Sequence, residues 1–458
     1  MNKFDQSESS LLNRASSIEI GKNLRKTHPL EAHEFVKRRP KDFSSNAILE
    51  KSNKDRLPEL IPIRYGRMLA SPFTFLRGSA ALMADDLSRT PNSGIYVQAC
   101  GDCHLLNFGA FATPERKLVF DINDFDETLP APWEWDVKRL AISFLVSSQD
   151  NGIDDETARL IAKTCVRSYR ENLRKYSKLS PLELSYKQLD LAKYAQNAPT
   201  KKTKLYREEL IKRAETRVAE YLFPKITTEI DGKKRLLDQP PLMFHPHKAN
   251  FDALAKMAIK DYRESLPHDR RVLIDRYQLQ DVVLKVVGIG SVGTRCFVAL
   301  FMTPDDEPLL LQVKEARTSV LEPYAGKSKY EKHGERVVVG QRLTQSSADI
   351  FLGWTRGAEG RDFYVRQLRD MKVSFSFDEV TPARLENYAE YCGKALARSH
   401  AKSGNAAMIS GYLGKSDVFD EAVSRFSMEY AKQNQKDYDT LLHAVRKGAI
   451  KASTETDS

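Results

Sequence analysis

The side chains best suited to chemistry in this chain lie within one short segment, residues 101–127. Three polar residues share a loop at its start, and three acids follow an apolar stretch at its end: Asp102, His104, Asn107, Asp121, Asp124 and Asp126. Hard cations such as Mg²⁺ prefer oxygen ligands and are usually held by one or two carboxylates together with substrate phosphates. The segment therefore predicts an active site that binds a divalent metal ion against phosphate oxygens.

The spacing within the segment indicates individual roles. Asp102 and Asn107 are five positions apart, as in a kinase catalytic loop, where the Asp orients the attacking hydroxyl and the Asn binds metal. Asp124 lies where the second metal ligand is expected, with Asp121 or Asp126 to assist it. His104 stands in the same loop and is a further catalytic candidate. For any one of these residues, the alternative is a loop whose polar side chains only satisfy backbone groups.

Two other kinds of site match part of the same segment. Cys100, Cys103 and His104 satisfy the C-x-x-C-H signature of covalent haem attachment. That chemistry needs export to an oxidising compartment, whereas the first residues show neither the apolar core nor the cleavage site of a signal peptide. A zinc site would need a second Cys or His pair at a ligand spacing, which the sequence does not offer. We therefore expect neither haem nor zinc.

A second region with chemical potential lies far downstream. Residues 288–293, GIGSVG, match G-x-G-x-x-G, but the strand-like TRCFVALFM follows them, whereas a dinucleotide-binding unit would continue as a helix. A glycine-rich hairpin followed by a lysine on the next strand is the kinase arrangement for holding ATP phosphates. The predicted nucleotide-binding residues are Gly288, Gly290, Ser291, Gly293 and Lys314. A bulged hairpin and a solvent-facing lysine are the alternatives.

The segment after Lys314 is typical of a helix and carries two acids, Glu331 and Glu335. In kinases a helix glutamate pairs with the strand lysine and keeps it directed at the phosphates. Either acid would serve, and the sequence does not choose between them.

Four regions would position these residues. Residues 1–45 are polar and basic, which predicts a flexible or draped arm. Residues 46–268 are mostly helical in pattern and hold the catalytic loop. Residues 269–375 alternate β-branched residues with turn signals, which predicts a β-rich nucleotide-binding lobe. Residues 376–458 are typical of long helices that complete the helical lobe, the first beginning at an N-cap Thr followed by Pro.

Further charged residues have both structural and functional interpretations. Arg64, Arg67 and Arg77 either form a solvated, ion-paired helix face or point toward a phosphate. Asp136 stands at the start of an apolar helix, where we expect it to cap backbone amides. His400, near the end of a long helix, is expected to be a packed structural residue.

Bulk properties exclude several classes of protein. No apolar run approaches the roughly 20 residues of a membrane helix, so we expect no membrane partner. The five Cys are scattered and odd in number, which favours a reducing cytoplasm over a disulfide framework. The net charge of +10 over 458 residues is compatible with an anionic ligand and with solvated lysines and arginines. A nucleic-acid partner is compatible with this charge, but no motif indicates one.

These motifs resemble a known class of enzyme. Gly101-Asp102-x-His104-x-x-Asn107, then Asp124-Phe125-Asp126, then Asp136 before Leu140-Ala141 resemble the core of aminoglycoside phosphotransferases, a branch of the kinase-like proteins. Over nearly its full length the chain also resembles the bacterial family of domain of unknown function 2252, in SPFTFLRG, the catalytic-loop block and GYLGKSDVFDEA. The first resemblance implies a two-lobed α+β fold, Mg²⁺ and ATP as cofactors, and Asp102, Asn107, Asp124 and Lys314 in the roles given above.

Departures from the kinase pattern are as informative as the matches. Cys100 stands where aminoglycoside kinases have a His before Gly-Asp, and Asp126 replaces the glycine of protein kinases. The catalytic loop also precedes the glycine-rich hairpin, whereas ordinary kinases have the opposite order. A circular permutation would account for that order, since domain termini are often close in space. The permutation requires Lys314 and the hairpin glycines to face Asp124 across one cleft.

The sequence therefore favours an ATP- and Mg²⁺-dependent phosphotransferase acting on an unidentified hydroxyl-bearing acceptor, small molecule or protein. An enzyme of the same fold that transfers AMP, or a nucleotide-binding pseudokinase, is the first alternative. A non-catalytic binding protein that uses its basic surface is the second. Fold analogy alone does not decide among these functions.

Overall fold

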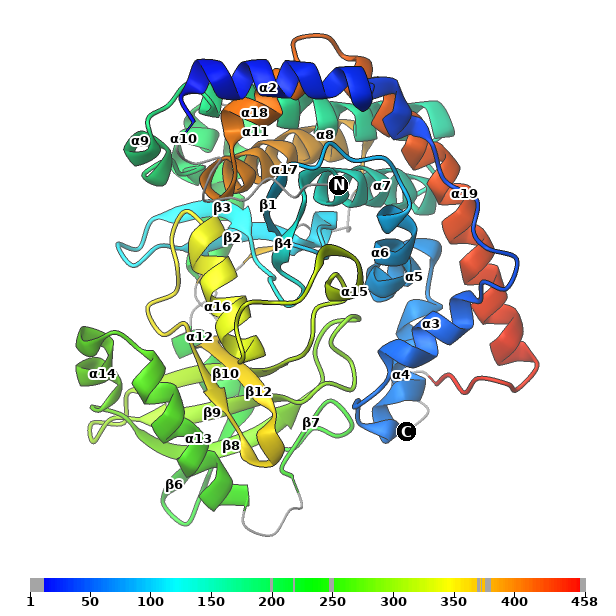
Figure 1. The fold of residues 1–458 in the computed structure, drawn as a ribbon. Helices are drawn as coiled ribbons and strands as arrows, with labels where there is room; N and C mark the ends of the chain where they lie inside the picture. Colours follow the sequence, from blue (N-terminus) through cyan, green and yellow to red (C-terminus); the bar gives the residue numbers. More distant parts are fainter. Residues whose placement is uncertain are drawn as a thin grey trace.

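The computed structural model describes residues 12–197, 201–216, 219–246, 251–368, 371, 373–374 and 380–453. The fold is mixed α and β and mostly helical, with small antiparallel sheets. Figure 1 shows the largest sheet gathered at one end of the molecule and most of the helices at the other. Within the described residues, no helix combines the length and hydrophobicity that crossing a membrane requires.

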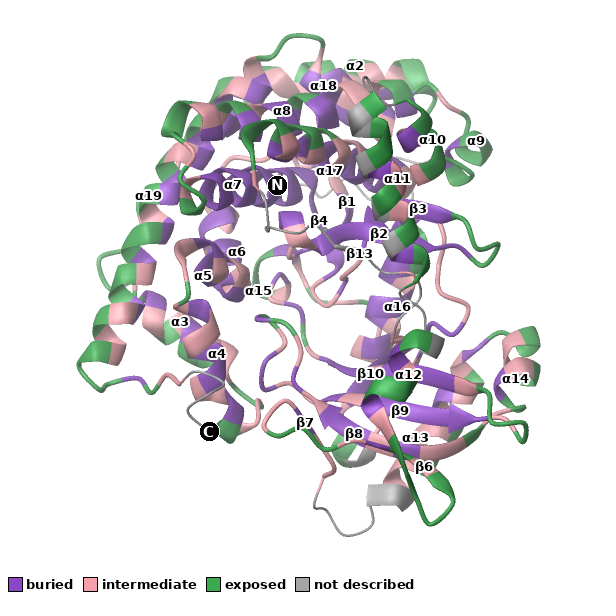
Figure 2. Cartoon of the chain, turned by 180° about the vertical axis from the view of Figure 1, so that it is seen from behind, coloured by how far each residue is buried: buried purple, intermediate pink, exposed green. Residues whose placement is uncertain are grey.

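The helical part is built around α7, Trp133–Asp150, which is buried along nearly its whole length. Figure 2 shows this burial, in contrast to the exposed helix α9, Pro181–Ser185. A helix that is buried all round must be covered by other elements, and α8, α17 and α19 pack around it. Their bounds are Asp155–Tyr176, Pro382–Ser403 and Val418–Arg446.

The long helix α17 begins as the sequence predicts, with the Thr381 side chain accepting a hydrogen bond from the amide of Arg384. Its other end packs against the start of strand β1, Tyr96–Ala99. A Cβ on Gly404, just after the helix, would lie 2.6 Å from Cγ1 of Val97. This close approach brings the end of α17 to the strand that leads into the candidate catalytic loop.

For the N-terminal segment the sequence predicts a flexible or draped arm, and from residue 12 onward the structure shows a segment packed on the helical part. Residues Arg14–Thr27 form helix α2, capped by the Asn13 side chain, and α2 packs on α18, Ala406–Leu413. The contact is close because Gly21 has no side chain, since a Cβ there would lie 2.0 Å from the carbonyl oxygen of Met408. The polar composition did not indicate this packed helix, because a helix with small residues on one face needs few large apolar side chains to pack. Residues 1–11 lie outside the described residues.

The largest sheet has the strand order β11-β12-β10-β9-β8-β7, all antiparallel. The strands are β7 Met243–Phe244, β8 Gln278–Lys285, β9 Cys296–Met302, β10 Pro308–Ala316, β11 Gly353–Arg356 and β12 Asp362–Gln367. Because β7 joins this sheet, the β-rich lobe begins earlier than the expected residue 269. The glycine-rich turn connects β8 to β9, and Lys314 lies on β10, as predicted.

The two faces of this sheet are covered by different helices. Helix α13, Phe251–Ser265, lies over one face, where Thr355 donates a hydrogen bond to the carbonyl of Ala258. Helix α16, His333–Thr344, lies over the other, where Gly334 meets the neighbouring strands. Alternate residues of a strand point to opposite faces, so Lys314 shares the α16 face with its cross-strand neighbour Tyr364.

The candidate catalytic loop is framed by short strands. Strand β1 pairs with β4, Leu129–Pro132. Strand β2, Phe108–Ala112, lies between β3, Leu118–Ile122, and β13, Val373–Ser374, and pairs with both. The other elements are η1 Leu30–Glu34, α3 Ser45–Ser52, η2 Pro58–Leu60, α4 Ile61–Met68, α5 Pro72–Gly78, α6 Ala80–Ser88, η3 Leu105–Asn107, α10 Leu191–Gln196, α11 Lys201–Glu215, α12 Ala219–Ile226, β5 Thr227–Ile230, β6 Lys233–Leu236, α14 His268–Ile274, α15 Glu322–Ala325 and η4 Ala358–Gly360.

A buried ion pair joins α17 to this framework. Arg398 Nη2 lies 2.7 Å from Oδ1 and 2.8 Å from Oδ2 of Asp121, at the end of β3, and both side chains are fully buried. Asp121 also accepts hydrogen bonds from the amide and hydroxyl of Ser346, each 2.8 Å long. Asp121 is therefore a structural residue, and the expectation that it assists metal binding is wrong.

Replacing Asp121 by Asn should lower the free energy of unfolding by about 3–5 kcal/mol, because the charge of Arg398 would remain buried without its partner. Urea unfolding followed by the fluorescence of Trp133 and Trp135 in α7 would measure the loss. The matched control, Glu229→Gln, removes an exposed partner of Lys234 and should change little. Equal effects of the two substitutions would contradict the structural role of Asp121.

Candidate functional site

Three loops meet around a small cavity between the helical part and the large sheet. The first loop follows β1 and comprises residues 100–107. The second follows β3 and comprises residues 123–128, and the third, residues 286–295, connects β8 to β9. The cavity has a volume of about 110 Å³ and is lined by Ser52, Arg56, Arg64, Arg77, Gly78, Ala80, Ala81, Cys100, Asp102, His104, Asn107, Asp124, Asp126, Glu127, Gly288, Ile289, Gly290, Ser291 and Val320. Most of the residues singled out from the sequence therefore converge on one place.

Asp102 is held from one side only. The guanidinium of Arg139, on α7, contacts Oδ1 through Nη2 and through Nε at 2.7 Å. Oδ2 faces the cavity, 4.0 Å from Nε2 of His104 and 3.9 Å from where a Cβ on Gly290 would stand. Burial raises the pKa of Asp102 against the opposing charge of Arg139. One carboxylate oxygen thus remains available to a ligand.

The backbone of this loop is held by Asp136. Its carboxylate accepts hydrogen bonds from the amides of Cys100, at 2.6 Å, and Gly101, at 3.0 Å. The expected cap at the start of α7 is wrong, since that helix begins after Pro132 without a side-chain cap. His400 lies 3.2 Å from Asp136, so α17 helps to hold the loop. Gly101 is required by its φ of +87° and because a Cβ would lie 2.4 Å from the carbonyl oxygen of Glu127.

Lys314 reaches the acidic loop across the gap between the two parts of the molecule. Its Nζ lies 2.8 Å from Oδ2 of Asp126 and 3.4 Å from Oδ2 of Asp124. Tyr364 donates a 2.6 Å hydrogen bond to Oδ1 of Asp126. The Ser291 hydroxyl, in the glycine-rich turn, donates one of 3.3 Å to Oδ2 of the same carboxylate. Lysine, both acids and the glycine-rich turn therefore form one connected cluster.

The charges in this cluster are unequally stabilised. Burial alone would raise the pKa of Asp124, but the charges of Lys314 and Arg366 hold this pKa below its ordinary value. The pKa of Asp126 is raised by burial and by its neighbour Asp124. Burial opposes the ammonium of Lys314, but the two carboxylates raise its pKa. Asp124 is thus the acid of the pair whose charged form is favoured.

The expected glutamate partner of Lys314 is not present in this arrangement. Glu331 lies 3.1 Å from Arg356 and is largely exposed. Within the described part of the chain, the ion pairs of Lys314 are those to Asp124 and Asp126, and Glu335 makes none with it. Helix α16 instead contributes Arg336, which donates to the carbonyls of Asp126, at 2.8 Å, and Thr128, at 2.6 Å. The helix thus positions the acidic loop rather than the lysine.

The donor set at the acidic loop matches the ligands that Mg²⁺ prefers. Asp124 supplies a carboxylate one-third exposed to the cavity. Asn107 donates through Nδ2 to the carbonyl of Asp102, so its amide oxygen is the atom left for a ligand. No cluster of three or more His, Cys, Asp or Glu side chains able to hold a metal occurs among the described residues. One or two carboxylates nevertheless suffice where phosphates complete the coordination.

Arginines surround the acids. Arg64 and Arg77, two of the three arginines noted in the sequence, line the cavity together with Arg56. The third, Arg67, donates a 2.7 Å hydrogen bond to the carbonyl of Gly288. Burial lowers the pKa of Arg77, with the charge of Asp102 opposing, and its buried Nε has no hydrogen-bond partner in the described structure. Such buried positive charge favours an anionic ligand.

The glycine-rich turn forms one wall of the small cavity. Ile289, at its tip, is buried in an apolar cluster with Leu49, Tyr65, Phe75 and Leu441 of the helical part. The amide of Leu57 donates a 2.8 Å hydrogen bond to the carbonyl of Gly293. Ligand pockets usually measure about 300–1,000 Å³, so in this conformation the turn leaves less room than a nucleotide needs.

Sequence reasoning missed several residues of the site. Arg139 lies within an apolar helical stretch and contacts Asp102 only because α7 passes beside the loop. Tyr364 and Arg366 lie on β12, and the register Lys314↔Tyr364 places them near the lysine. The alternation of β12 was visible in the sequence, but its pairing with β10 was not. Cys100 and Cys103, which suggested haem, are buried free thiols.

Comparison with known proteins places the chain beside a bacterial family. The model of a family described as "Uncharacterized protein conserved in bacteria (DUF2252)" matches residues 56–444. No curated protein and no solved structure matches the chain. The matched region includes all the candidate site residues that were singled out from the sequence.

Replacing Lys314 by Met should destabilise the protein in a pH-dependent way. In the native chain the lowered pKa of Asp124 contributes stability that is present above the ordinary pKa of 3.8 and is lost as the pH falls below that value, through the lowered pKa of the folded protein. Without Lys314, burial would raise this pKa and stability would fall as the pH rises. The loss should be about 3 kcal/mol at neutral pH, decrease toward acidic pH, and become small only well below pH 3.8, where Asp124 of the native chain is protonated as well.

Urea unfolding at acidic and neutral pH would measure the difference. Lys234→Met is the matched control, because Lys234 pairs with Glu229 on an exposed hairpin. A loss for Lys314→Met that does not depend on pH would show that the lysine does not stabilise the charged acids.

Proposed function

We propose that this chain, which belongs to the bacterial family DUF2252, is an ATP- and Mg²⁺-dependent phosphotransferase acting on a hydroxyl-bearing acceptor. The observation that carries the proposal is the contact between Lys314 and Asp124, residues 190 positions apart in the chain. In phosphoryl transfer the protein mainly positions the reacting groups and stabilises their charge electrostatically. A strand lysine, an acidic loop and a glycine-rich turn around one cavity supply these requirements.

Asp102 is proposed to orient the acceptor hydroxyl and take its proton. The support is geometric, because Arg139 occupies only Oδ1 while Oδ2 faces the cavity. A general base must lie within hydrogen-bonding reach of the proton it accepts, and the free oxygen meets this requirement for a hydroxyl in the cavity. His104 is buried beside it, and burial together with the charge of Arg77 lowers the pKa of its imidazole. The neutral ring would then take part in hydrogen bonding rather than charge stabilisation.

The phosphate groups are proposed to lie between the glycine-rich turn and the acidic loop. Lys314 and the amides of Gly288, Gly290 and Gly293 would hold the nucleotide, with Arg77 as an additional positive charge. Asp124 and Asn107 would hold Mg²⁺, and Asp126 would assist. The chemistry that Mg²⁺ supplies when bound is neutralisation of phosphate charge. To admit the nucleotide, the turn carrying Ile289 has to lift away from the helical part.

We also propose that the fold is a circularly permuted two-lobed kinase-like fold. The contact between the end of α17 and the start of β1 supports this. In the aminoglycoside kinase order, a helix resembling α17 comes just before the catalytic loop. Here the Ser403 hydroxyl accepts a hydrogen bond from the amide of Gln98, 3.3 Å away, although 305 positions separate the two residues. Joining these neighbouring points would restore the ordinary order of the motifs.

Thermal unfolding with Mg²⁺ and ATP tests the nucleotide site. Ligand at about 100 times its dissociation constant should add roughly 2.7 kcal/mol of stability. Each variant is compared with its own ligand-free form, because Lys314→Ala is itself destabilising. The stabilisation should be lost in Asp124→Ala and Lys314→Ala and kept in the exposed-acid control Asp269→Ala. A full stabilisation of both site variants would overturn the proposal.

Asp102→Asn separates binding from chemistry. It should retain the stabilisation by Mg²⁺ and ATP but lower the rate of ADP release in the presence of acceptors by about 10²–10⁴-fold, the usual contribution of a general base. Product analysis distinguishes phosphoryl from AMP transfer, because only the first releases ADP. Loss of nucleotide binding in a folded Asp102→Asn protein would contradict its assigned role.

Gly290→Ala tests the glycine-rich turn. A Cβ there has no neighbour closer than 3.9 Å, so the ligand-free protein should remain as stable as the native one. The added methyl group would nevertheless lie between the backbone and the phosphates, and we expect roughly tenfold weaker nucleotide binding, about 1.4 kcal/mol.

Gly293→Ala is the contrasting variant. Its φ of +83° is unfavourable for residues with a side chain, so the ligand-free protein should lose about 1 kcal/mol of stability. Isothermal titration and thermal unfolding of both variants provide the two measurements. Unchanged nucleotide affinity in Gly290→Ala would place the phosphates elsewhere.

A further inference from the structure

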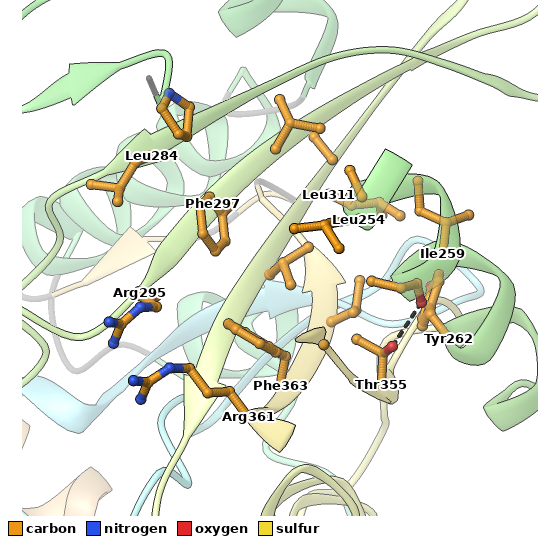
Figure 3. A pocket seen from close by; sticks show the side chains of 18 of the residues that line it. Leu254, Ile259, Tyr262, Leu284, Arg295, Phe297, Leu311, Thr355, Arg361 and Phe363 are labelled. Carbon is orange, nitrogen blue, oxygen red and sulfur yellow. Dashed lines mark hydrogen bonds between the residues drawn. The ribbon is translucent and has the colours of Figure 1, made fainter. Parts of the chain in front are cut away.

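A second and larger cavity lies on the opposite face of the large sheet from Lys314. Its volume is about 400 Å³, within the range of small-molecule sites. Its floor consists of alternate residues of the strands, including Leu284, Phe297, Val313 and Phe363, and helix α13 covers it with residues such as Leu254. Figure 3 shows the side chains of Leu254, Phe297 and Phe363 in the space between the strands and the helix.

The inner part of the cavity is lined by apolar side chains, which fill only part of the space between the sheet and helix α13. Toward one end, Tyr262 of α13 packs in a buried cluster with Ala299 and Leu311. Toward the other end, Phe297 and Val313 remain half-buried, although the sheet and a helix lie on either side of them. Exposed apolar surface of this kind is favourably removed from water by an apolar ligand.

Charged residues form a row at the mouth of the cavity. Glu315 follows Val313 on the same face of β10 and is nearly fully buried. Arg361 Nη1 lies 3.1 Å from its Oε1, and Arg295 Nη1 lies 3.5 Å from its Oε2. Figure 3 shows the two arginines next to each other beside Phe297 and Phe363.

The arginines retain donors for a ligand. Each guanidinium carries five N–H groups, and Glu315 engages one Nη of each. Arg295 makes one further hydrogen bond, to the carbonyl of Asp55. The buried Nε of Arg361 has no hydrogen-bond partner in the described residues. This atom lies 3.6 Å from Oε2 of the exposed Glu359, with which Arg361 forms an ion pair. Planar guanidinium groups with free donors suit a carboxylate.

We propose that this cavity binds a monomeric aliphatic carboxylate, with its chain along the sheet and its head group on Arg295 and Arg361. An apolar cavity with a few converging polar groups at its mouth is the usual form of such a site. The site is separate from the candidate phosphotransfer site, because Lys314 points to the other face of the sheet. The inference therefore stands whether or not the protein transfers phosphate.

The mouth of the cavity lies close in the chain to the candidate phosphotransfer site. Arg295 lies two residues after Gly293, its amide donates a 2.9 Å hydrogen bond to Glu315, and Glu315 follows Lys314 directly.

Isothermal titration of the full chain with octanoate, decanoate and dodecanoate, each below its micelle concentration, tests the proposal. We expect one saturable site whose affinity rises roughly fourfold for each added methylene group. Decanol, which lacks the charge, should bind about tenfold more weakly than decanoate. Binding of several carboxylate molecules per chain with low affinity, or an affinity independent of chain length, would overturn the proposal.

Variants locate the bound molecule. Arg361→Gln should weaken decanoate about tenfold and leave decanol unchanged, whereas Arg263→Gln, on the outside of α13 and paired with Asp275, should change neither. Val313→Trp should abolish binding by filling the cavity. Leu254→Trp fills it from the helix side and replaces that test if Val313→Trp does not fold. Native affinity in a folded, filled variant would show that the carboxylate binds elsewhere.

Discussion

Much of the arrangement around the small cavity depends on keeping the ammonium of Lys314 charged although it is only 3% exposed. Desolvation of an ammonium in a protein costs several kcal/mol unless opposite charges and hydrogen bonds compensate it. Asp124 and Asp126 provide that compensation, but they belong to a loop in the other part of the molecule. The ion pairs therefore join the large sheet to the helical part.

Several contacts fix the acidic loop where this compensation requires it. Arg336 holds two of its carbonyls from α16, and Arg366 donates a 2.8 Å hydrogen bond to the carbonyl of Asn123. The neighbouring loop is fixed by Asp136, which is supported in turn by His400. Arg336, Asp136 and His400 are buried, so the carboxylates and the lysine meet without much freedom to rearrange. Electrostatic sites gain strength from such prior orientation, because little energy is spent on reorganising them when a ligand binds.

The sequence was sufficient to bring Asp102, Asp124, the glycine-rich turn and Lys314 to one site, because each belongs to a local motif with its own spacing. It was misleading for Asp121, whose acidic type suits a metal but whose partner, Arg398, lies 277 positions away. Arg139 was missed for a related reason, since a cation within an apolar helix becomes informative only once the neighbouring loop is known. The close packing of helix α2 was not apparent from the sequence, because small residues such as Gly21 allow a polar helix to pack closely. Local chemistry was thus predictable, whereas pairings set by distant segments were not.

The buried tip of the glycine-rich turn has a consequence for affinity. Removing the side chain of Ile289 from its apolar cluster exposes it to water at a cost of roughly 1.5–3 kcal/mol. On that basis alone, an open, accessible form would make up on the order of 1–10% of the molecules at rest. The apparent dissociation constant of any ligand that needs this form rises by the inverse of that fraction. A substitution that shortens Ile289 would therefore tighten binding without touching the ligand, and a partner protein that competes for the apolar cluster would have the same effect.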